Sequence, residues 1–385
     1  MNRPKHLAFL WDVLILASTS FGGQQVHMAL YLERLVKKKQ YLSEEELFEI
    51  HALCSVLPGP TSTQVLTAIG LKRGGTSLAY LTTLMWISPA IFIMTLAAFG
   101  MTYLQNKAIL HFVLPVGVGL SLQSGWVMAK KVINGPLYVL ILLITIFIGI
   151  LFPNPFIFPL VIVLGGVISS FNYKLFPRQN KHKMVIPWAN FHLYWGFLVL
   201  LALLGHFTDY FPIRIFENFY RNGSLVFGGG QVLAPVLFTE FVEFKHLISS
   251  DDFLTGMALS QSLPGPVFAL TSYLGVLLMK DYGTIGQLTG SAIGALGVFL
   301  PGTFMIFFVF RIWSQLKQYR FIRASLAGIQ AASVGLTGVA VYAFMNPIII
   351  QGDFIALGVI LITFILSQST RLPSIVLFMM ALMAG

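Results

Sequence analysis

Phe21-Gly22-Gly23 and Pro58-Gly59-Pro60 return later in the chain as Phe227-Gly228-Gly229 and Pro264-Gly265-Pro266. Phe227 lies 206 positions after Phe21, and Pro264 lies 206 positions after Pro58. The same register joins Gln25 with Gln231, Val26 with Val232, Ala52 with Ala258 and Leu53 with Leu259. The chain is therefore an internal duplication, and its two copies carry helix-breaking residues at matched positions.

The composition around these motifs is that of a membrane protein. Hydrophobic residues make up 56% of the chain and charged residues 10%, against about 25% charged residues in soluble domains. The formal net charge of +10 does not indicate a nucleic-acid partner, because the Lys and Arg residues lie in short loops between apolar runs, where they set orientation. The single cysteine, Cys54, excludes a disulfide within the chain. We therefore expect a lipid bilayer around the chain and no nucleic acid.

The apolar runs predict an all-α, polytopic fold. Uninterrupted runs of spanning or nearly spanning length are Ser77–Phe99, Leu110–Ala129, Leu137–Leu151, Phe156–Ser170, Phe191–Gly205, Ile285–Phe310, Ala324–Phe344, Phe354–Leu366 and Pro373–Gly385. Four other stretches contain a Gly or Pro motif near their middle and are predicted to be broken or re-entrant helical hairpins, since two prolines around a glycine block continuous helix. These are Leu7–Val36, Leu47–Leu71, Ile213–Val242 and Phe253–Met279.

The basic loops change places between the two copies. In the first copy the loop from Met101 to Leu110 is poor in basic residues, whereas the matching loop of the second copy contains Arg311, Lys317, Arg320 and Arg323. Basic loops stay on the cytoplasmic side, so the two copies are predicted to be inserted with opposite orientation. The expected domains are an N-terminal repeat (1–175), a basic cytoplasmic connector with an inverting helix (176–212) and a C-terminal inverted repeat (213–385). Inverted repeats with broken helices are typical of alternating-access transporters.

The broken helices predict a site for an inorganic oxyanion. A helix that restarts inside the membrane presents unpaired backbone N–H groups and a partial positive charge, which favour an anion. Neutral donors near these breaks can bind an oxyanion without a cation that would hold it too tightly. The alternative is that the Gly and Pro residues only allow kinks and close helix packing. The candidate binding residues are Phe21, Gly22, Gly23, Gln25, Pro58, Gly59, Pro60, Thr61, Ser62, Gln64, Phe227, Gly228, Gly229, Gly230, Gln231, Gln261, Pro264, Gly265 and Pro266.

Few ionisable residues lie near these hairpins. Glu33 and Glu240 are the candidate proton-coupling groups, because an ionisable group at membrane depth is costly and usually functional. The alternative is that Glu33 ends its helix at the interface and pairs with a lysine. His27 is interpreted as a satisfied helix residue, and Cys54 as a small buried hydrophobe. The sequence contains no nucleotide-binding motif, metal-ligand cluster or hydrolase motif, so we expect no enzyme activity, metal or cofactor.

These motifs resemble the chromate ion transporter family, in its long form with two domains. The resemblance is carried by Phe-Gly-Gly, a following Glu, Ala-Leu-x-x-x-x-Pro-Gly-Pro and a later helix containing Pro89 or Pro301, and it covers nearly the whole chain. Pro235 belongs to the same pattern. In the first copy, Gln24 stands where the family has proline, and Ser55 stands where the second copy has Gln261.

The resemblance implies chromate efflux through the cell membrane, driven by the proton gradient, with sulfate as a related anion. Two other functions are compatible with the same residues: uptake or exchange of sulfate or a related anion, and an anion channel. A homodimer is one option for assembly. The sequence leaves the direction of transport and the coupling ion open.

Overall fold

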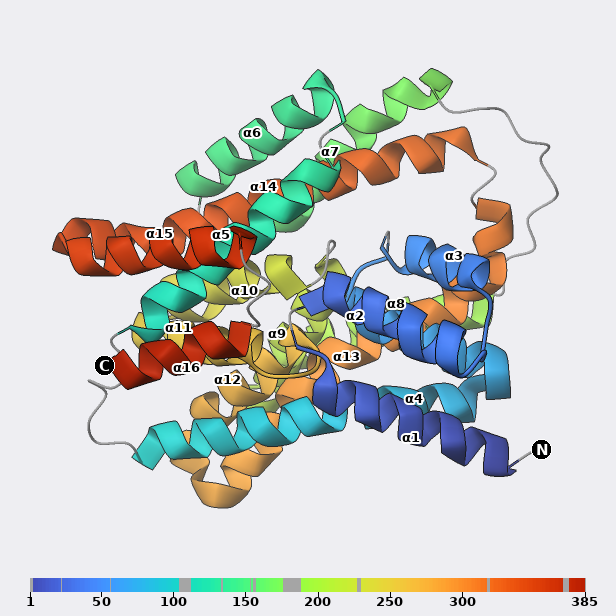
Figure 1. The fold of residues 1–385 in the computed structure, drawn as a ribbon, viewed down its shortest axis with the longest axis horizontal. Coiled ribbons are helices and arrows are strands. Elements are labelled where there is room, and N and C mark those ends of the chain that lie inside the picture. Colours follow the sequence, from blue (N-terminus) through green and yellow to red (C-terminus); the bar gives the residue numbers. More distant parts are fainter. Residues whose placement is uncertain are drawn as a thin grey trace. The chain divides into compact units, whose positions relative to one another are not determined.

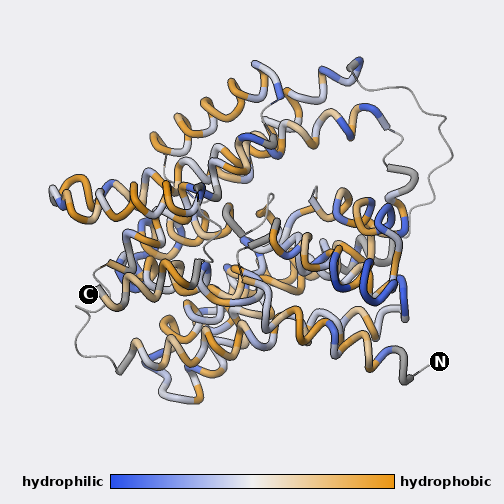
Figure 2. Tube along the Cα trace, in the orientation of Figure 1, coloured by the Kyte–Doolittle hydropathy of each residue, from blue (hydrophilic) through white to orange (hydrophobic). Residues whose placement is uncertain are grey.

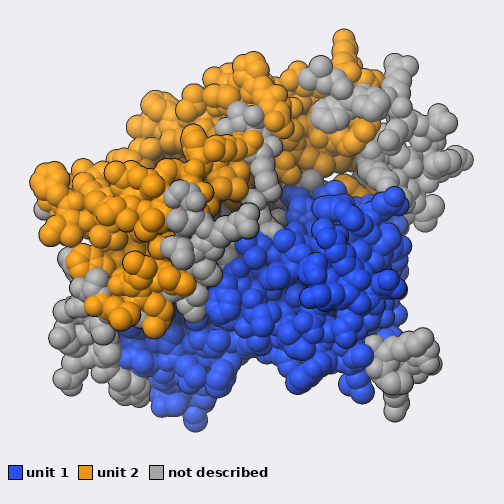
Figure 3. Space-filling model, viewed as in Figure 1, with its two compact units in different colours: residues 1–105, 187–225, 259–311 blue, residues 106–186, 226–258, 312–385 orange. Residues whose placement is uncertain are grey.

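A computed structural model describes residues 3–21, 23–55, 57–103, 112–132, 134–152, 154, 157–175, 188–226, 230–316, 319–369 and 374–384. The regular elements of these residues are all helices, as the sequence predicted (Figure 1). The chain divides into two compact units that alternate along the sequence (Figure 3). Unit 1 contains residues 1–105, 187–225 and 259–311, and unit 2 contains residues 106–186, 226–258 and 312–385. Each unit therefore includes segments of both sequence copies.

Unit 1 is built on two long helices. Its elements are α1 (Arg3–Thr19), α2 (Gly23–Tyr31), the π-helix η1 (Leu32–Lys38), α3 (Glu44–Cys54), α4 (Thr61–Tyr103), α8 (Trp188–Phe207), α9 (Phe211–Leu225), the end of α11 (Ser250–Ser262), the short 3₁₀ turns η5 (Val267–Ala269) and η6 (Lys280–Tyr282), α12 (Leu270–Leu278) and most of α13 (Gly283–Leu316). Helices α1, α3 and α12 pack against α4, and α8 packs against α9. The residues that interrupt helices in this unit therefore lie around α4.

Unit 2 is centred on α14 (Arg320–Gln351), which packs against its neighbours α5, α6, α7 and α10. Its other elements are α5 (Val113–Val132), α6 (Pro136–Leu151), α7 (Ile157–Ser170), η3 (Phe171–Leu175), α10 (Gly230–Phe238), the π-helix η4 (Thr239–Phe244), most of α11 (Ser250–Ser262), α15 (Phe354–Ser369) and α16 (Ser374–Ala384). A Cβ atom on Gly328 of α14 would lie 2.0 Å from the Gly165 carbonyl oxygen of α7, so glycine is required where these two helices meet.

All four predicted helix breaks are present. Helix α1 ends at Thr19 before α2 begins at Gly23, and α3 ends at Cys54 before α4 begins at Thr61. In the second copy α9 ends at Leu225 and α10 begins at Gly230, while α11 ends at Ser262 and leads through η5 into α12. Gly and Pro chemistry thus sets the helix ends in both copies.

The two copies also repeat an unusual backbone that the sequence did not predict. A π-helix follows α2 as η1 and follows α10 as η4. After them come Gln40 (φ 50°) and His246 (φ 52°), which lie 206 positions apart and are the non-glycine residues with positive φ in the described part of the chain. Gly59 (φ 110°) and Gly265 (φ 102°) form a second such pair. The duplication therefore extends to strained backbone positions, which side-chain patterning does not reveal.

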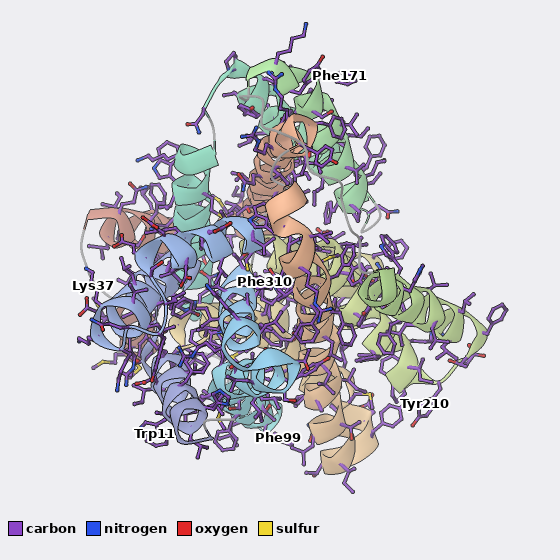
Figure 4. All side chains as sticks on the ribbon, turned by 90° about the vertical axis from the view of Figure 1, so that its right-hand side faces the viewer. Trp11, Lys37, Phe99, Phe171, Tyr210 and Phe310 are labelled. Carbon is purple, nitrogen blue, oxygen red and sulfur yellow. The ribbon has the colours of Figure 1, made fainter. Side chains whose placement is uncertain are left out.

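Several helices have the length and composition of membrane spans. Four described helices are long and apolar enough to cross a bilayer: Thr61–Met101, Ile157–Lys174, Lys280–Trp313 and Arg320–Ile350. Helix α4 is interrupted at Gly74 and Gly75, where the backbone leaves helical geometry. Apolar residues cover most of α6 and α15 (Figure 2). Large apolar side chains such as Trp11 and Phe171 are exposed and point outward (Figure 4), as expected for side chains that face lipid.

Candidate functional site

The first Pro-Gly-Pro turn lies buried at the start of α4. Gly59 has a φ of 110°, and the Gln64 N–H donates the first helical bond of α4 to the Pro60 carbonyl at 2.9 Å. The backbone N–H groups of Thr61, Ser62 and Thr63 precede that bond and have no acceptor within the helix. This end of α4 therefore has the donor arrangement that the sequence predicted.

Gln64 holds this turn in place. Its Nε2 donates to the Pro58 carbonyl at 2.7 Å and contacts the Gly302 carbonyl of α13 at 3.4 Å. A Cβ atom on Gly59 would lie 3.2 Å from the Gly302 Cα. Because both amide hydrogens face carbonyls, Gln64 positions the turn, and its buried Oε1 has no hydrogen-bond partner.

The second Pro-Gly-Pro turn packs against the first copy. The Gly265 N–H donates to the Ser20 carbonyl at 3.0 Å, beside the first Phe-Gly-Gly motif. A Cβ atom on Gly265 would lie 2.9 Å from the Ala90 Cβ. Ala90 follows Pro89, just as Gly302 follows Pro301. Each Pro-Gly-Pro turn therefore contacts the residue after the helix proline of the other copy.

A buried histidine of α2 contacts the backbone at the break between α1 and α2. His27 is 1% exposed, and its Nε2 lies 3.3 Å from the Ser20 carbonyl, which also accepts the Gly265 N–H. The imidazole meets Trp86 of α4 edge-on, with ring centroids 5.1 Å apart, and stacks on Tyr31 at 6.4 Å. Its Nδ1 and the Ser20 Oγ are buried without a hydrogen-bond partner. The expectation that His27 is a satisfied helix residue is thus correct for one ring nitrogen only.

The surroundings of this break are polar but neutral. Trp86 Nε1 donates to Thr63 Oγ1 at 3.1 Å, and Tyr31 OH donates to the Ser62 carbonyl at 3.3 Å. Among the described residues, the buried ones include two carboxylates, Asp12 and Glu240, and no Lys or Arg. An anion bound here would meet hydroxyl and backbone donors instead of a fixed cation, because the single indole N–H of Trp86 is already donated to Thr63.

Asp12 belongs to a separate charged cluster that ties α1 to η1. Arg34 donates through Nε and Nη2 to Asp12 Oδ1 at 3.0 and 2.7 Å, and Tyr41 OH donates to Oδ2 at 2.7 Å. Burial, reinforced by this hydrogen bond, raises the pKa of Tyr41 to about 12. The Arg73 guanidinium lies 4.3 Å from the Tyr41 ring centroid. These groups bind one another and hold α1 against η1, so their role is structural.

The two coupling candidates occupy different environments. The Glu33 side chain is 51% exposed, and its Oε1 lies 3.4 Å from Lys38 Nζ. The Glu240 side chain is 2% exposed, and its Oε1 lies 2.7 Å from Lys245 Nζ. Both carboxylates therefore already have a lysine partner, and only Glu240 is buried.

The structure places part of the predicted site together in unit 1. Unit 2 contains Gly230, Gln231 and Glu240. Unit 1 contains the larger group: Phe21, Pro58, Gly59, Pro60, Thr61, Ser62, Gln64, Gln261, Pro264, Gly265 and Pro266. Gly23 and Gln25 lie in the first turn of α2, where the structure describes the backbone only. Gly22, Phe227, Gly228 and Gly229 lie outside the described residues. Sequence reasoning missed Trp86, Ala90 and Gly302, because only tertiary packing brings them to the motifs.

Comparison with known proteins gives consistent matches. The family described as chromate transporter matches residues 7–170 and 213–385. An uncharacterised transporter of Methanocaldococcus jannaschii is 24% identical over 95% of this chain and 90% of its own. A chromate transport protein of Cupriavidus metallidurans is 26% identical over 85% of this chain and 80% of its own, and a probable chromate transport protein of Synechococcus elongatus is 24% identical over 75% and 71%.

No solved structure matches the chain. The family match covers both sequence copies, including all four helix breaks and the apolar helices described above. The chain therefore belongs to the chromate transporter family, and it is a multi-pass membrane protein and a transporter.

Proposed function

We propose that the chain is a secondary transporter that exports an inorganic oxyanion, chromate, across the cell membrane by using the proton gradient. The carrying observation is the junction at Ser20, where the first helix break meets the second Pro-Gly-Pro turn through the Gly265 N–H. Two restarted helices, α2 and α4, belong to the same unit as this junction. Their N-terminal N–H groups and partial positive charge suit a tetrahedral oxyanion. The names of the relatives support chromate as the anion.

Neutral donors suit a carrier better than a buried cation does. A transported ion must bind well enough to enter and weakly enough to leave. The described residues bury no Lys or Arg, so the anion would exchange its hydration for backbone and hydroxyl donors. Sulfate has the same charge and geometry as chromate and is the expected competitor.

Alternating access is the expected mechanism. We propose that the two copies, 1–175 and 213–385, are inserted with opposite orientation around the connecting segment 176–212, as the exchange of basic loops indicates. The reciprocal contacts of Gly59 with Gly302 and of Gly265 with Ala90 support a two-fold relation between the copies. A carrier of this kind can expose its site to each side in turn.

The driving force is proposed to be the proton gradient, because the sequence contains no nucleotide-binding motif. Glu33 and Glu240 are the carboxylates that could take part in coupling. Each would first have to separate from its lysine, because an ion pair favours the charged carboxylate. Burial makes Glu240 the better candidate of the two.

Flux in proteoliposomes tests the proposal. Purified protein is reconstituted with imposed pH and anion gradients, and movement of radiolabelled chromate and sulfate is measured. We expect chromate flux that accelerates with the pH gradient, collapses with a protonophore and is inhibited by sulfate. Flux that ignores the pH gradient and shows no counter-flow would identify an anion channel. Cells that become more sensitive to chromate would identify uptake instead of export.

A further inference from the structure

The tautomer of His27 is fixed by the protein around it. The Ser20 carbonyl can only accept a hydrogen bond, so the Nε2 that lies 3.3 Å from it must carry the hydrogen. A neutral imidazole with hydrogen on Nε2 has a bare lone pair on Nδ1. That Nδ1 is buried and has no partner. A buried acceptor without a partner destabilises the folded chain, so its presence requires an explanation.

A bare lone pair is the wrong partner for an oxyanion. It would repel the lone pairs of an anion oxygen, whereas a proton between the two atoms turns the contact into a charge-assisted hydrogen bond. The proton can arrive on the imidazole as a second N–H, or on the anion as a hydrogen oxyanion whose O–H donates to Nδ1. Both routes end with the same contents of the site: one anion and one proton.

We propose that His27 Nδ1 is the proton-coupling group of the anion site, so that each oxyanion occupies the site together with one proton shared between an anion oxygen and Nδ1. This rests on the proposed function, because it presumes that the Ser20 junction binds the anion. The buried, unpartnered Ser20 Oγ, on the residue whose carbonyl anchors the imidazole, supplies a hydroxyl donor for the same ligand. No bond is made or broken other than those to the proton.

The other titratable groups near α2 already have hydrogen-bond or charge partners, or are exposed. Among the described residues of α2, η1 and α4, Tyr31 is the titratable side chain that stacks on the imidazole, and its OH donates to the Ser62 carbonyl. The charged residues of these elements pair elsewhere: Arg34 with Asp12, Lys38 with Glu33, Lys72 with Glu46, and Arg73 with Tyr41, while Lys37 is exposed. Asp12, on α1, is held by Arg34 and Tyr41. Two buried acceptors without a partner are described on these elements, His27 Nδ1 and the Gln64 amide Oε1, and of the two only the imidazole nitrogen is basic enough to take up a proton.

The second copy has no equivalent group. Leu233 lies 206 positions after His27 and is buried. The duplicated architecture therefore contains this proton site once per chain. This asymmetry predicts one proton per anion from this site.

Proton uptake on anion binding tests the assignment. Sulfate is added to the purified protein in weakly buffered detergent solution with a pH indicator, and bound sulfate is measured in parallel. We expect uptake of about one proton per anion at pH values above the usual histidine pKa of about 6.5. His27→Gln should bind sulfate more weakly and without proton uptake. His192→Gln, which alters an exposed histidine of α8, should behave like the wild type.

Two further measurements, pH-driven flux and Trp86 fluorescence, distinguish failure of the proposed function from failure of the His27 assignment. If the wild type shows no pH-driven flux, the proposed function fails whatever His27 does. If the wild type is pH-driven and His27→Gln keeps both the coupling and the proton uptake, His27 is not the coupling group. If His27→Gln does not fold, Trp86 serves as a reporter, because protonation of the adjacent imidazole should quench its fluorescence. Sulfate should then raise the pH midpoint of quenching, and Trp86→Phe should remove that response; a midpoint unmoved by sulfate overturns the assignment.

Discussion

At the scale of single residues, the two Pro-Gly-Pro glycines combine backbone strain with close contact. Gly59 and Gly265 have positive φ, which costs other residues about 1–2 kcal/mol, and a Cβ at either position would also touch the opposite copy. Gly75 and Gly283 have positive φ but open space around them. We expect Gly59→Ala and Gly265→Ala to lower the thermal stability and the anion flux more than Gly75→Ala and Gly283→Ala do. Equal losses in all four variants would show that strain alone matters and that the contacts between copies contribute nothing.

The two candidate carboxylates, Glu33 and Glu240, should respond differently to neutralisation. Glu240→Gln removes the buried half of a pair whose Lys245 side chain is 29% exposed, so its cost should lie between that of an exposed pair, about 0–1 kcal/mol, and that of a fully buried one, about 3–5 kcal/mol. Glu33→Gln removes an exposed pair worth about 0–1 kcal/mol. We therefore expect a larger loss of stability in the Glu240 variant than in the Glu33 variant, where it should be nearly absent, measured by thermal unfolding in detergent. We also expect pH-driven flux to survive Glu33→Gln, and loss of coupling there would return that residue to the mechanism.

At the scale of elements, α3 begins with a reciprocal cap that makes its stability depend on pH. Ser43 Oγ accepts the Glu46 N–H, and Glu46 accepts the Ser43 N–H and a hydrogen bond from Lys72. The hydrogen bonds from Lys72 and Ser43 lower the pKa of Glu46. Because the pKa is lower in the folded chain, this stabilisation is present above the ordinary value of 4.5 and is lost as the pH falls through the lowered pKa.

Removing the cap tests this dependence. Ser43→Ala should cost about 1 kcal/mol at neutral pH. Glu46→Gln tests the titrating group, and its difference from the wild type should shrink as the pH falls through the lowered pKa of Glu46, because the wild-type carboxylate then becomes neutral as well. Ser249→Ala removes the matching cap of α11, where Ser249 Oγ accepts the Asp252 N–H at 3.1 Å, and serves as the comparison. Denaturation at several pH values measures all three variants, and a pH-independent difference for Glu46→Gln would show that the Glu46 carboxylate adds nothing to the cap.

The helix ends were predictable, and the residues that meet around them were not. The breaks at Phe21 and at Pro58 follow from local chemistry, since glycine and proline disfavour helix wherever they stand. The π-helices after α2 and α10, and the contacts of Gly265 with Ala90 and Ser20, depend on tertiary packing that no local pattern contains. His27 carried one local sign of function, its place one turn after Gly23.

At the scale of the whole molecule, the opposite orientation of the two copies remains a prediction from the basic loops. Single cysteines placed at Lys181 or Gln318 should be labelled by an impermeant reagent only from the cytoplasm, and a cysteine at Gln351 only from outside. Cys54 is buried and can be replaced by alanine to remove background labelling. Labelling of Gln105→Cys and Gln318→Cys from the same side would contradict inverted repeats.

Because each Pro-Gly-Pro turn packs against the opposite copy, the chain should not fold as two independent halves. A cut between residues 175 and 188 would separate Gly265 from Ala90 and Gly59 from Gly302, and would divide both compact units. Each fragment alone would present a turn whose supporting surface is encoded on the other. Co-expressed fragments should reassemble a working carrier, while either fragment alone should be degraded. In this chain each copy therefore supplies the surface against which the Pro-Gly-Pro turn of the other copy packs.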